Sequence, residues 1–205
     1  RRQRQMCIRD RFKPEDMSST DAYKLISGLV IPRPIAWLTT QNSTGLVNAA
    51  PFSFFNVVSK DPVIVSIAMT EMKDSVRNLL ETKEGVIHLV NMDNVEAMNQ
   101  TSAPLTATES EIEKFDIKIT ASEEVKVPAI ENAKARLEVV LHQHIPVGKT
   151  SQLMLLEVKN ILMDDSVIDE ERLYIKAKEL DPIARLSGRA YTSLGHTFEI
   201  TRPTK

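Results

Sequence analysis

The sequence predicts a mainly β (α+β) domain, in which a closed or partly closed antiparallel β-barrel carries peripheral helices. At least six runs of strand length are separated by turn residues. They follow one another as hairpins rather than as regular βαβ units, which argues against a doubly wound parallel sheet. Closing such a sheet into a barrel removes its exposed edges. No internal repeat or linker divides the chain, so we expect one domain over residues 12–205.

The first strands are predicted from short apolar runs that flank turn residues. Residues 35–40 (IAWLTT) and 46–50 (LVNAA) enclose the turn sequence QNSTG at 41–45, a pattern that indicates a hairpin. Residues 63–69 (VIVSIAM) and 86–90 (VIHLV) are continuous apolar runs, typical of buried strands. Together they predict the first half of the barrel.

Two long alternating runs predict the second half. Residues 135–145 and 152–162 alternate apolar and polar side chains, and only a short connection separates them. Strands joined by so short a link pair antiparallel. The histidines of the first run, His142 and His144, share one face and could ligate a metal, although no third ligand is evident. We therefore expect no metal site.

Helices are expected between these strands. Thr20 is a plausible N-cap for a helix whose apolar face carries Ala22, Leu25, Ile26 and Leu29. Further helices are predicted to begin near residue 73 and after residue 91. Residues 103–114 indicate a mobile segment with a short acidic helix, whose glutamates Glu109, Glu111 and Glu113 are expected on a solvated face or lid.

Composition excludes several classes of function. The chain has 205 residues and a formal net charge of -2, so it lacks the basic field that nucleic acid or anionic lipid requires. It has one cysteine and no apolar run long enough to cross a membrane, which is compatible with a cytoplasmic location. The first residues, RRQRQMCIRDR at 1–11, show no periodicity, and we interpret them as a non-native or disordered segment.

Three short segments contain candidate binding residues. In KDSVRN, Lys73 and the Ser75 hydroxyl stand at a predicted helix start, where free amides and the helix dipole favour a phosphate; an ordinary helix cap is the alternative. In NAAPFSFFN (48–56), small residues and a proline would let a planar heterocycle approach the backbone, although a bent buried strand is also possible. Arg33 is held between two prolines, and the only tryptophan, Trp37, is more typical of a core.

Taken together, these segments resemble a known family. IPRPIAWLTT, NAAPFSFFNVVSKDPVIVSIAM and KDSVRNLL match the flavin reductase-like, FMN-binding split-barrel family in type, order and spacing. The preceding DAYKLISGLV and the tail LSGRAYTSLGHTFEITRP are similar as well, so that the resemblance covers roughly residues 12–203. Two departures concern the tail, where Ser187-Gly188 replaces a common Gly-Gly pair, and KDS, which replaces the commoner Lys-Asp-Thr.

The resemblance implies a six-stranded Greek-key split barrel that forms a homodimer and binds FMN near the subunit interface. It assigns the phosphate to Lys73, Asp74, Ser75 and Asn78, and the flavin ring to Arg33, Asn48, Ala49, Ala50, Pro51 and Ser53. Ser53 would donate toward the N5/O4 edge of the ring, and Arg189 and Tyr191 would close the site from the tail.

The implied activity is that of an NAD(P)H-dependent flavin reductase, in which a hydride passes from the nicotinamide to flavin N5. A separate monooxygenase component is then a possible partner that receives the reduced flavin. Two alternatives are a flavoprotein with tightly bound FMN acting on its own organic substrate, and a non-catalytic flavin or electron carrier. FMN and FAD, and NADH and NADPH, remain alternatives at this point. No GxGxxG fingerprint is present, so the nicotinamide is not expected to bind through a Rossmann unit.

Overall fold

The computed structural model describes residues 10–203 of the chain. The interpretation of residues 1–11 as a non-native or disordered segment therefore lies outside the described residues, except for Asp10 and Arg11, which are exposed.

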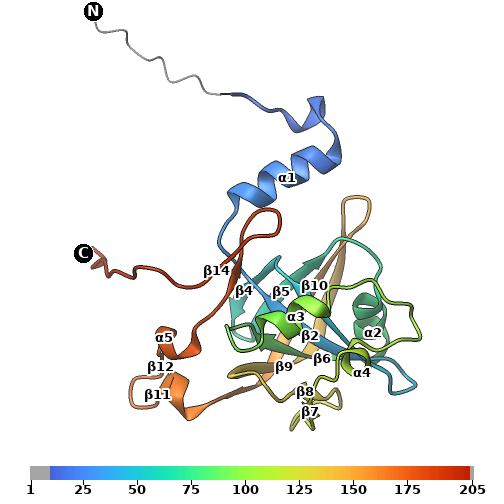
Figure 1. Ribbon diagram of the computed structural model, residues 1–205, viewed down its shortest axis with the longest axis vertical. Helices are drawn as coiled ribbons and strands as arrows, with labels where there is room; N and C mark the ends of the chain where they lie inside the picture. Colours follow the sequence, from blue (N-terminus) through green and yellow to red (C-terminus); the bar gives the residue numbers. More distant parts are fainter. Residues whose placement is uncertain (1–9, 204–205) are drawn as a thin grey trace, which may run out of the picture.

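The centre of the molecule is one antiparallel sheet that curls into a barrel (Figure 1). Its seven strands run in the order β3-β2-β6-β9-β10-β5-β4. β3 also lies next to β5, although the two are far apart in this order, so the sheet closes on itself at that point. The strands are β2 (Ala36–Gln41), β3 (Val47–Phe52), β4 (Phe55–Lys60), β5 (Val63–Met69), β6 (Glu84–Leu89), β9 (Ala135–Val147) and β10 (Ser151–Met163).

The predicted mainly β class is confirmed, and so are both predicted hairpins. β2 pairs with β3 around the turn at residues 42–46, and β9 pairs with β10 over nearly their whole length. The sheet has seven strands instead of six because the apolar stretch 51–59 divides into the end of β3 and a separate strand, β4. A bulge between Val57 and Ser59 bends β4 as it pairs with β5.

Helices and three small sheets surround the barrel. The helices are α1 (Ser19–Leu29), α2 (Asp74–Thr82), α3 (Val95–Gln100), α4 (Glu111–Lys114) and α5 (Ala177–Leu180), with 3-10 turns η1 (Pro14–Asp16) and η2 (Asp165–Val167). The small sheets are β1-β13-β14, β7-β8 and β11-β12, formed by β1 (Arg33–Pro34), β7 (Ile119–Thr120), β8 (Ala129–Ile130), β11 (Ile168–Asp169), β12 (Tyr174–Ile175), β13 (Ala184–Arg185) and β14 (Tyr191–Thr192). None of the helices within residues 10–203 has the length and apolar character needed to span a membrane.

Two apolar clusters fill the space inside and beside the barrel. In the first, Val76 and Leu79 of α2 pack against Leu38, Ile67 and other inward residues of the sheet. The second contains Trp37, which is 1% exposed and donates from Nε1 to the Thr101 hydroxyl at 3.0 Å. Trp37 is therefore a core residue, as its sequence context indicated. These clusters pack β2, β3 and α2 together, and all three contribute to the site described below.

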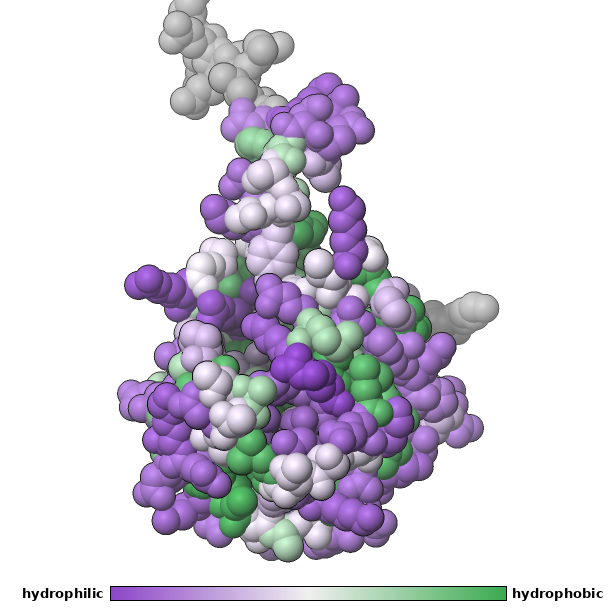
Figure 2. All heavy atoms as spheres, turned by 90° about the vertical axis from the view of Figure 1, so that its right-hand side faces the viewer, coloured by the Kyte–Doolittle hydropathy of each residue, from purple (hydrophilic) through white to green (hydrophobic). Residues whose placement is uncertain are grey.

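Helix α1 differs from the prediction in its start and in its surroundings. Ser18, not Thr20, is the N-cap, because its hydroxyl accepts from the Asp21 amide at 3.1 Å. The predicted apolar face exists but is not buried, since Ile26 is 56% and Leu29 77% exposed. Figures 1 and 2 show the helix standing away from the barrel. Within the single chain, this apolar face has no core to cover.

The buried histidine of β6 makes stability depend on pH. His88 is fully buried, with Nδ1 bonded to the Trp37 carbonyl oxygen at 2.8 Å and Nε2 accepting from the Ile130 amide at 2.9 Å. The pKa of His88 is lowered from 6.5 to about 4, chiefly by burial; the Trp37 carbonyl opposes the shift, and the charge of Arg136 adds to it. The neutral ring is therefore the form that the fold accepts.

We expect the free energy of unfolding to fall by about 3 kcal/mol as the pH drops from 6.5 to 4, because only the unfolded chain then takes up this proton. Below pH 4 both states bind it and this contribution no longer changes. Urea denaturation at several pH values measures the effect. His142→Gln is the control, because His142 is exposed on β9 and its loss should leave this pH dependence unchanged. A His88→Gln variant that lost stability over this range as steeply as the native chain would contradict the assignment.

Candidate functional site

Three adjoining cavities form a trough across one end of the barrel. One of about 450 Å³ lies at the start of α2 and is called the α2 cavity, with Lys73, Asp74 and Ser75 in its lining. One of about 910 Å³ lies between α1, α3 and the segment 185–191, and is called the tail cavity. A smaller one of about 170 Å³ lies between them. Pro51 lines all three, so the cavities meet at the end of β3.

The α2 cavity contains a helix start with free donors. The amides of Val76 and Arg77 bond to the Lys73 carbonyl, whereas within residues 10–203 those of Asp74 and Ser75 have no such partner. The Asp74 carboxylate is paired with the Arg77 guanidinium, which offsets its negative charge. The Lys73 ammonium is exposed and the Ser75 side chain is buried beside it. An anionic group would find backbone amides, a helix dipole and a cation here.

Beneath the α2 cavity, a buried chain of polar groups links α2, β3 and α4. The side-chain amide of Asn78 donates to the Thr40 hydroxyl at 3.1 Å and to the side-chain oxygen Oδ1 of Asn48 at 3.3 Å. The Asn48 amide donates in turn to Glu111 Oε2 at 2.9 Å, and the Ala49 backbone amide donates to the same oxygen at 3.1 Å. Asn48 still borders the cavity, whereas Asn78 and Ala49 lie behind its wall and support it.

Glu111 corrects the expectation of a solvated acidic face. It is only 6% exposed, because Ser110 caps α4 and bonds to the Val47 carbonyl, which holds the helix against β3. Burial raises the pKa of the Glu111 carboxyl, and the charge of Asp74 adds to the rise, whereas the bonds from Ala49 and Asn48 oppose it. Glu113 is exposed, as expected, whereas Glu109 is partly exposed, and the pKa of its carboxyl is lowered to about 2 by bonds from Thr106 and Lys114.

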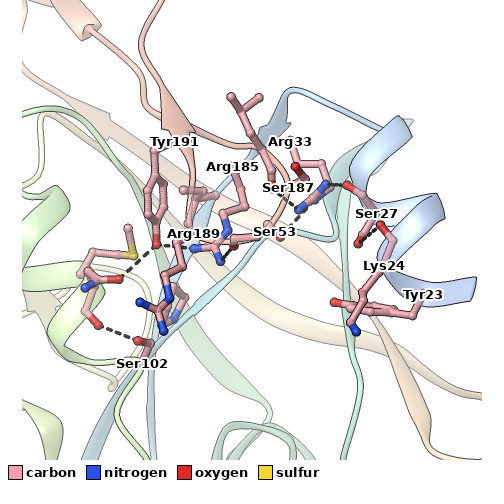
Figure 3. A pocket seen from close by; sticks show the side chains of 16 residues that line it. Tyr23, Lys24, Ser27, Arg33, Ser53, Ser102, Arg185, Ser187, Arg189 and Tyr191 are labelled. Carbon is pink, nitrogen blue, oxygen red and sulfur yellow. Dashed lines mark hydrogen bonds between the residues drawn. The ribbon is translucent and has the colours of Figure 1, made fainter. Parts of the chain in front are cut away.

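At the middle of the trough, Arg33 orients the hydroxyl of Ser53. Arg33 Nε donates to Ser53 Oγ at 3.2 Å, and its terminal nitrogens donate to the carbonyls of Ser27, Val30 and Leu186 (Figure 3). Arg33 is 8% exposed and contacts no carboxylate in the described part of the chain. Because the Ser53 oxygen already accepts from Arg33, its own hydrogen is free to be donated into the adjoining cavities.

The C-terminal segment returns to the barrel and closes the tail cavity. β13 pairs with β1, so that Arg185 lies opposite Arg33, and Gly188 (φ +58°) forms the turn toward β14. The Arg185 guanidinium lies over the Tyr191 ring at 4.6 Å and donates to its hydroxyl, which donates to Asn99 Oδ1 at 3.1 Å. Arg189 is exposed and its side chain extends into the cavity (Figure 3).

The structure therefore brings ten of the twelve predicted binding residues to one trough and sets Ala49 and Asn78 directly behind it. The ten are Arg33, Asn48, Ala50, Pro51, Ser53, Lys73, Asp74, Ser75, Arg189 and Tyr191. Sequence reasoning missed Glu111, Arg185 and Lys24, which border the same cavities. No three His, Cys, Asp or Glu side chains cluster as a metal site among residues 10–203.

Comparison with known proteins identifies the class. The model of the flavin reductase like domain matches residues 28–184, and the chain belongs to this family. Nitrilotriacetate monooxygenase component B from Bacillus cereus is 34% identical with a TM-score of 0.91, over 94% of this chain and 99% of that one. Pseudomonas fluorescens 2-nitrobenzoate 2-nitroreductase is 31% identical with a TM-score of 0.89, over 95% and 97%.

A more distant likeness confirms the predicted fold class. A putative flavin reductase with a split barrel domain from Shewanella frigidimarina is 17% identical with a TM-score of 0.84, over 92% of this chain and 96% of that one. The barrel of this chain is thus a split barrel. Family membership and the two closer likenesses support an oxidoreductase role.

Proposed function

We propose that the chain binds FMN along the trough and passes electrons to it from NAD(P)H, as a flavin reductase. The observation that carries the proposal is the meeting of the cavities at Pro51. A helix start with free amides lies at one end of the trough, and the Ser53 hydroxyl, whose hydrogen is free to be donated, lies at its centre. FMN has a phosphate and a planar ring separated by a ribityl chain, and this spacing of an anion site from a ring site fits it.

At the α2 cavity, the proposed phosphate partners are Lys73, the Ser75 hydroxyl and the amides of Asp74 and Ser75. Asn48, Ala49 and Asn78 act indirectly, by fixing the end of β3 against α2. The free donors of the helix start are the structural feature that fits the phosphate. No protein group within residues 10–203 is bonded to these amides, which leaves them free to donate to an anion.

At the centre of the trough, Ala50 and Pro51 offer a small, flat surface for the ring. Ser53 would donate a hydrogen bond to the N5/O4 edge, and the buried charge of Arg33 polarises that hydroxyl. Bound flavin supplies the hydride chemistry, and the protein supplies position, this hydrogen bond and access for the nicotinamide. With the chemistry supplied in this way, the protein needs no catalytic acid–base pair for the hydride transfer.

Replacing Ser53 with alanine is expected to slow flavin reduction by NADH about 2- to 10-fold, because one neutral hydrogen bond to the ring edge is worth about 0.5–1.5 kcal/mol. Stopped-flow absorbance measures the rate on FMN-saturated protein. Ser43→Ala is the matched control, since Ser43 lies exposed in the β2–β3 turn, outside the trough. Equal rates in all three proteins would remove Ser53 from the flavin site.

The experiment that tests the function itself is steady-state oxidation of NADH and NADPH with FMN or FAD as acceptor. A reductase oxidises the nicotinamide rapidly in a flavin-dependent manner. Ping-pong kinetics with free flavin would identify the diffusible form, in which a separate monooxygenase component receives reduced flavin. Binding of FMN without any turnover would leave the carrier alternative and contradict the reductase.

A second candidate function is reduction of an organic substrate by tightly bound FMN. It is favoured by the tail cavity, whose volume of about 910 Å³ extends beyond the proposed ring position. The likeness to a 2-nitrobenzoate nitroreductase points in the same direction. FMN that stays bound through gel filtration, together with turnover of an added nitroaromatic acceptor, would favour this function over the diffusible reductase.

We also propose that residues 12–205 form a single FMN-binding domain that acts in the cytoplasm as a homodimer. The likeness to a monooxygenase component supports a monooxygenase partner. The exposed apolar side chains of α1 support the homodimer, because Tyr23, Leu25, Ile26 and Leu29 would bury their surface against a second copy. α1 also borders the tail cavity, so a partner seated there would lie close to the site.

The double variant Ile26→Glu, Leu29→Glu is expected to convert the dimer to a folded monomer, since both side chains are exposed within one chain. Light scattering coupled to gel filtration gives the mass. Leu173→Glu is the control, because Leu173 is also 77% exposed but lies on the β11–β12 turn. A variant that retained the native dimer mass would place the interface elsewhere.

A further inference from the structure

The tail cavity has an unbalanced charge. Its lining contains four basic side chains, those of Lys24, Arg33, Arg185 and Arg189, and no aspartate or glutamate. The chain as a whole has a formal net charge of -2, so this local excess of positive charge does not follow from composition. A cleft lined by one sign of charge concentrates ligands of the opposite sign.

The four basic groups are not equally available. Arg33 is committed to Ser53 and three backbone carbonyls, and Arg185 to Tyr191 and the Gly188 carbonyl. These neutral partners fix the guanidinium groups without cancelling their charge. Lys24 has one exposed contact with Asp21 at 3.4 Å. Arg189 has no acidic partner among residues 10–203, which leaves its guanidinium free to bind a ligand.

The cavity also has a polar and an apolar end. Ile35, Pro51 and Met98 lie toward the barrel, beside Ser53, where the proposed flavin ring ends. Arg189 and Lys24 enter from the tail and from α1, on opposite sides of the opening (Figure 3). A substrate with a planar apolar part and an anionic group would place the first against Pro51 and the second between these two cations.

We propose that the tail cavity selects substrates that carry an oxyanion, bound chiefly by Arg189 with Lys24 beside it. The proposal rests on the flavin site described above and adds the substrate class. The oxyanion is either a phosphate of the nicotinamide donor, which is tetrahedral, or a carboxylate of a planar acceptor, which is flat. A guanidinium binds two oxygens of either group through paired N–H bonds. A neutral substrate of the same shape would gain nothing from these residues.

The test compares charged and neutral substrates on FMN-loaded protein. NADH and NADPH are paired with 1-benzyl-1,4-dihydronicotinamide, a neutral hydride donor without phosphates. As acceptors, 4-nitrobenzoate is paired with nitrobenzene. We expect Arg189→Gln to raise KM about tenfold for the charged member of at least one pair, and to leave both neutral members within about twofold. The pair that responds identifies the source of the oxyanion.

Arg172→Gln is the matched control, since Arg172 is exposed on the β11–β12 turn and lies outside all three cavities of the trough. Calorimetric titration with inorganic pyrophosphate and with 4-nitrobenzoate gives a readout independent of turnover, and Arg189→Gln should weaken one of the two. Equal changes for charged and neutral substrates, or none, would overturn the oxyanion site. FMN reduction by the neutral donor in Arg189→Gln would show that the flavin site stands even so.

Discussion

Replacing Lys73 with alanine is expected to weaken FMN binding by about 10- to 100-fold. A hydrogen bond between charged partners contributes about 1.5–3 kcal/mol, and the phosphate would lose the Lys73 cation while keeping the amides of Asp74 and Ser75; the other cation of the cavity, Arg77, is paired with Asp74. Quenching of flavin fluorescence measures the dissociation constant. The stability of the variant should be unchanged, because Lys73 is exposed and its side chain makes no capping bond.

Lys178→Ala controls for the general loss of a positive charge, since Lys178 is exposed on α5, outside the trough. A second test uses riboflavin, which lacks the phosphate. Lys73→Ala should bind riboflavin as the native chain does, because the ring site is untouched. An equal loss for FMN and riboflavin would mean that Lys73 acts on the structure of the trough and not on the phosphate.

Removing the Glu111 carboxylate is expected to lower the free energy of unfolding by about 2–6 kcal/mol. In Glu111→Ala the Asn48 amide and the Ala49 backbone amide both lose their shared acceptor inside the protein, and each buried donor without a partner costs about 1–3 kcal/mol. Glu111→Gln keeps one accepting oxygen and should recover part of the loss. Chemical denaturation followed by tryptophan fluorescence measures both, since Trp37 is buried in the adjoining cluster.

Glu111→Ala is also expected to change FMN binding. Because Glu111 holds β3 through Ala49 and the α2 cavity through Asn48, FMN affinity should fall in Glu111→Ala and recover in Glu111→Gln. Glu113→Ala on the same short helix is the control, as its side chain makes no such bond to β3. If Glu111→Ala matched Glu113→Ala in stability, the buried network would not support the trough in the way described.

Local sequence patterns were sufficient to predict most strands of the barrel. The turn residues at 41–45 and the continuous run at 63–69 predicted the β2–β3 hairpin and β5, because turn chemistry and an uninterrupted apolar run are signals carried by neighbouring residues. The pairing of β9 with β10 followed for the same reason. The phosphate and ring segments were placed by motif, and the fold then brought them to one trough.

The remaining features depend on contacts between distant residues. Glu111 cannot be separated from Glu109 and Glu113 by sequence, since its burial arises from α4 packing on β3, about 60 residues away in the chain. β1, β13 and β14 are two-residue strands whose pairing brings together segments about 150 residues apart in the chain. α1 has the periodicity of a core helix but stands off the barrel, because an amphipathic pattern does not specify which surface will cover it.

The central claim is that the trough binds flavin and that a nicotinamide reduces it there. The most direct test is an absorbance spectrum of the purified protein with FMN, followed by anaerobic addition of NADH. We predict a bound flavin band at about 450 nm that bleaches when NADH is added. A protein that neither carries flavin nor binds added FMN would contradict the account.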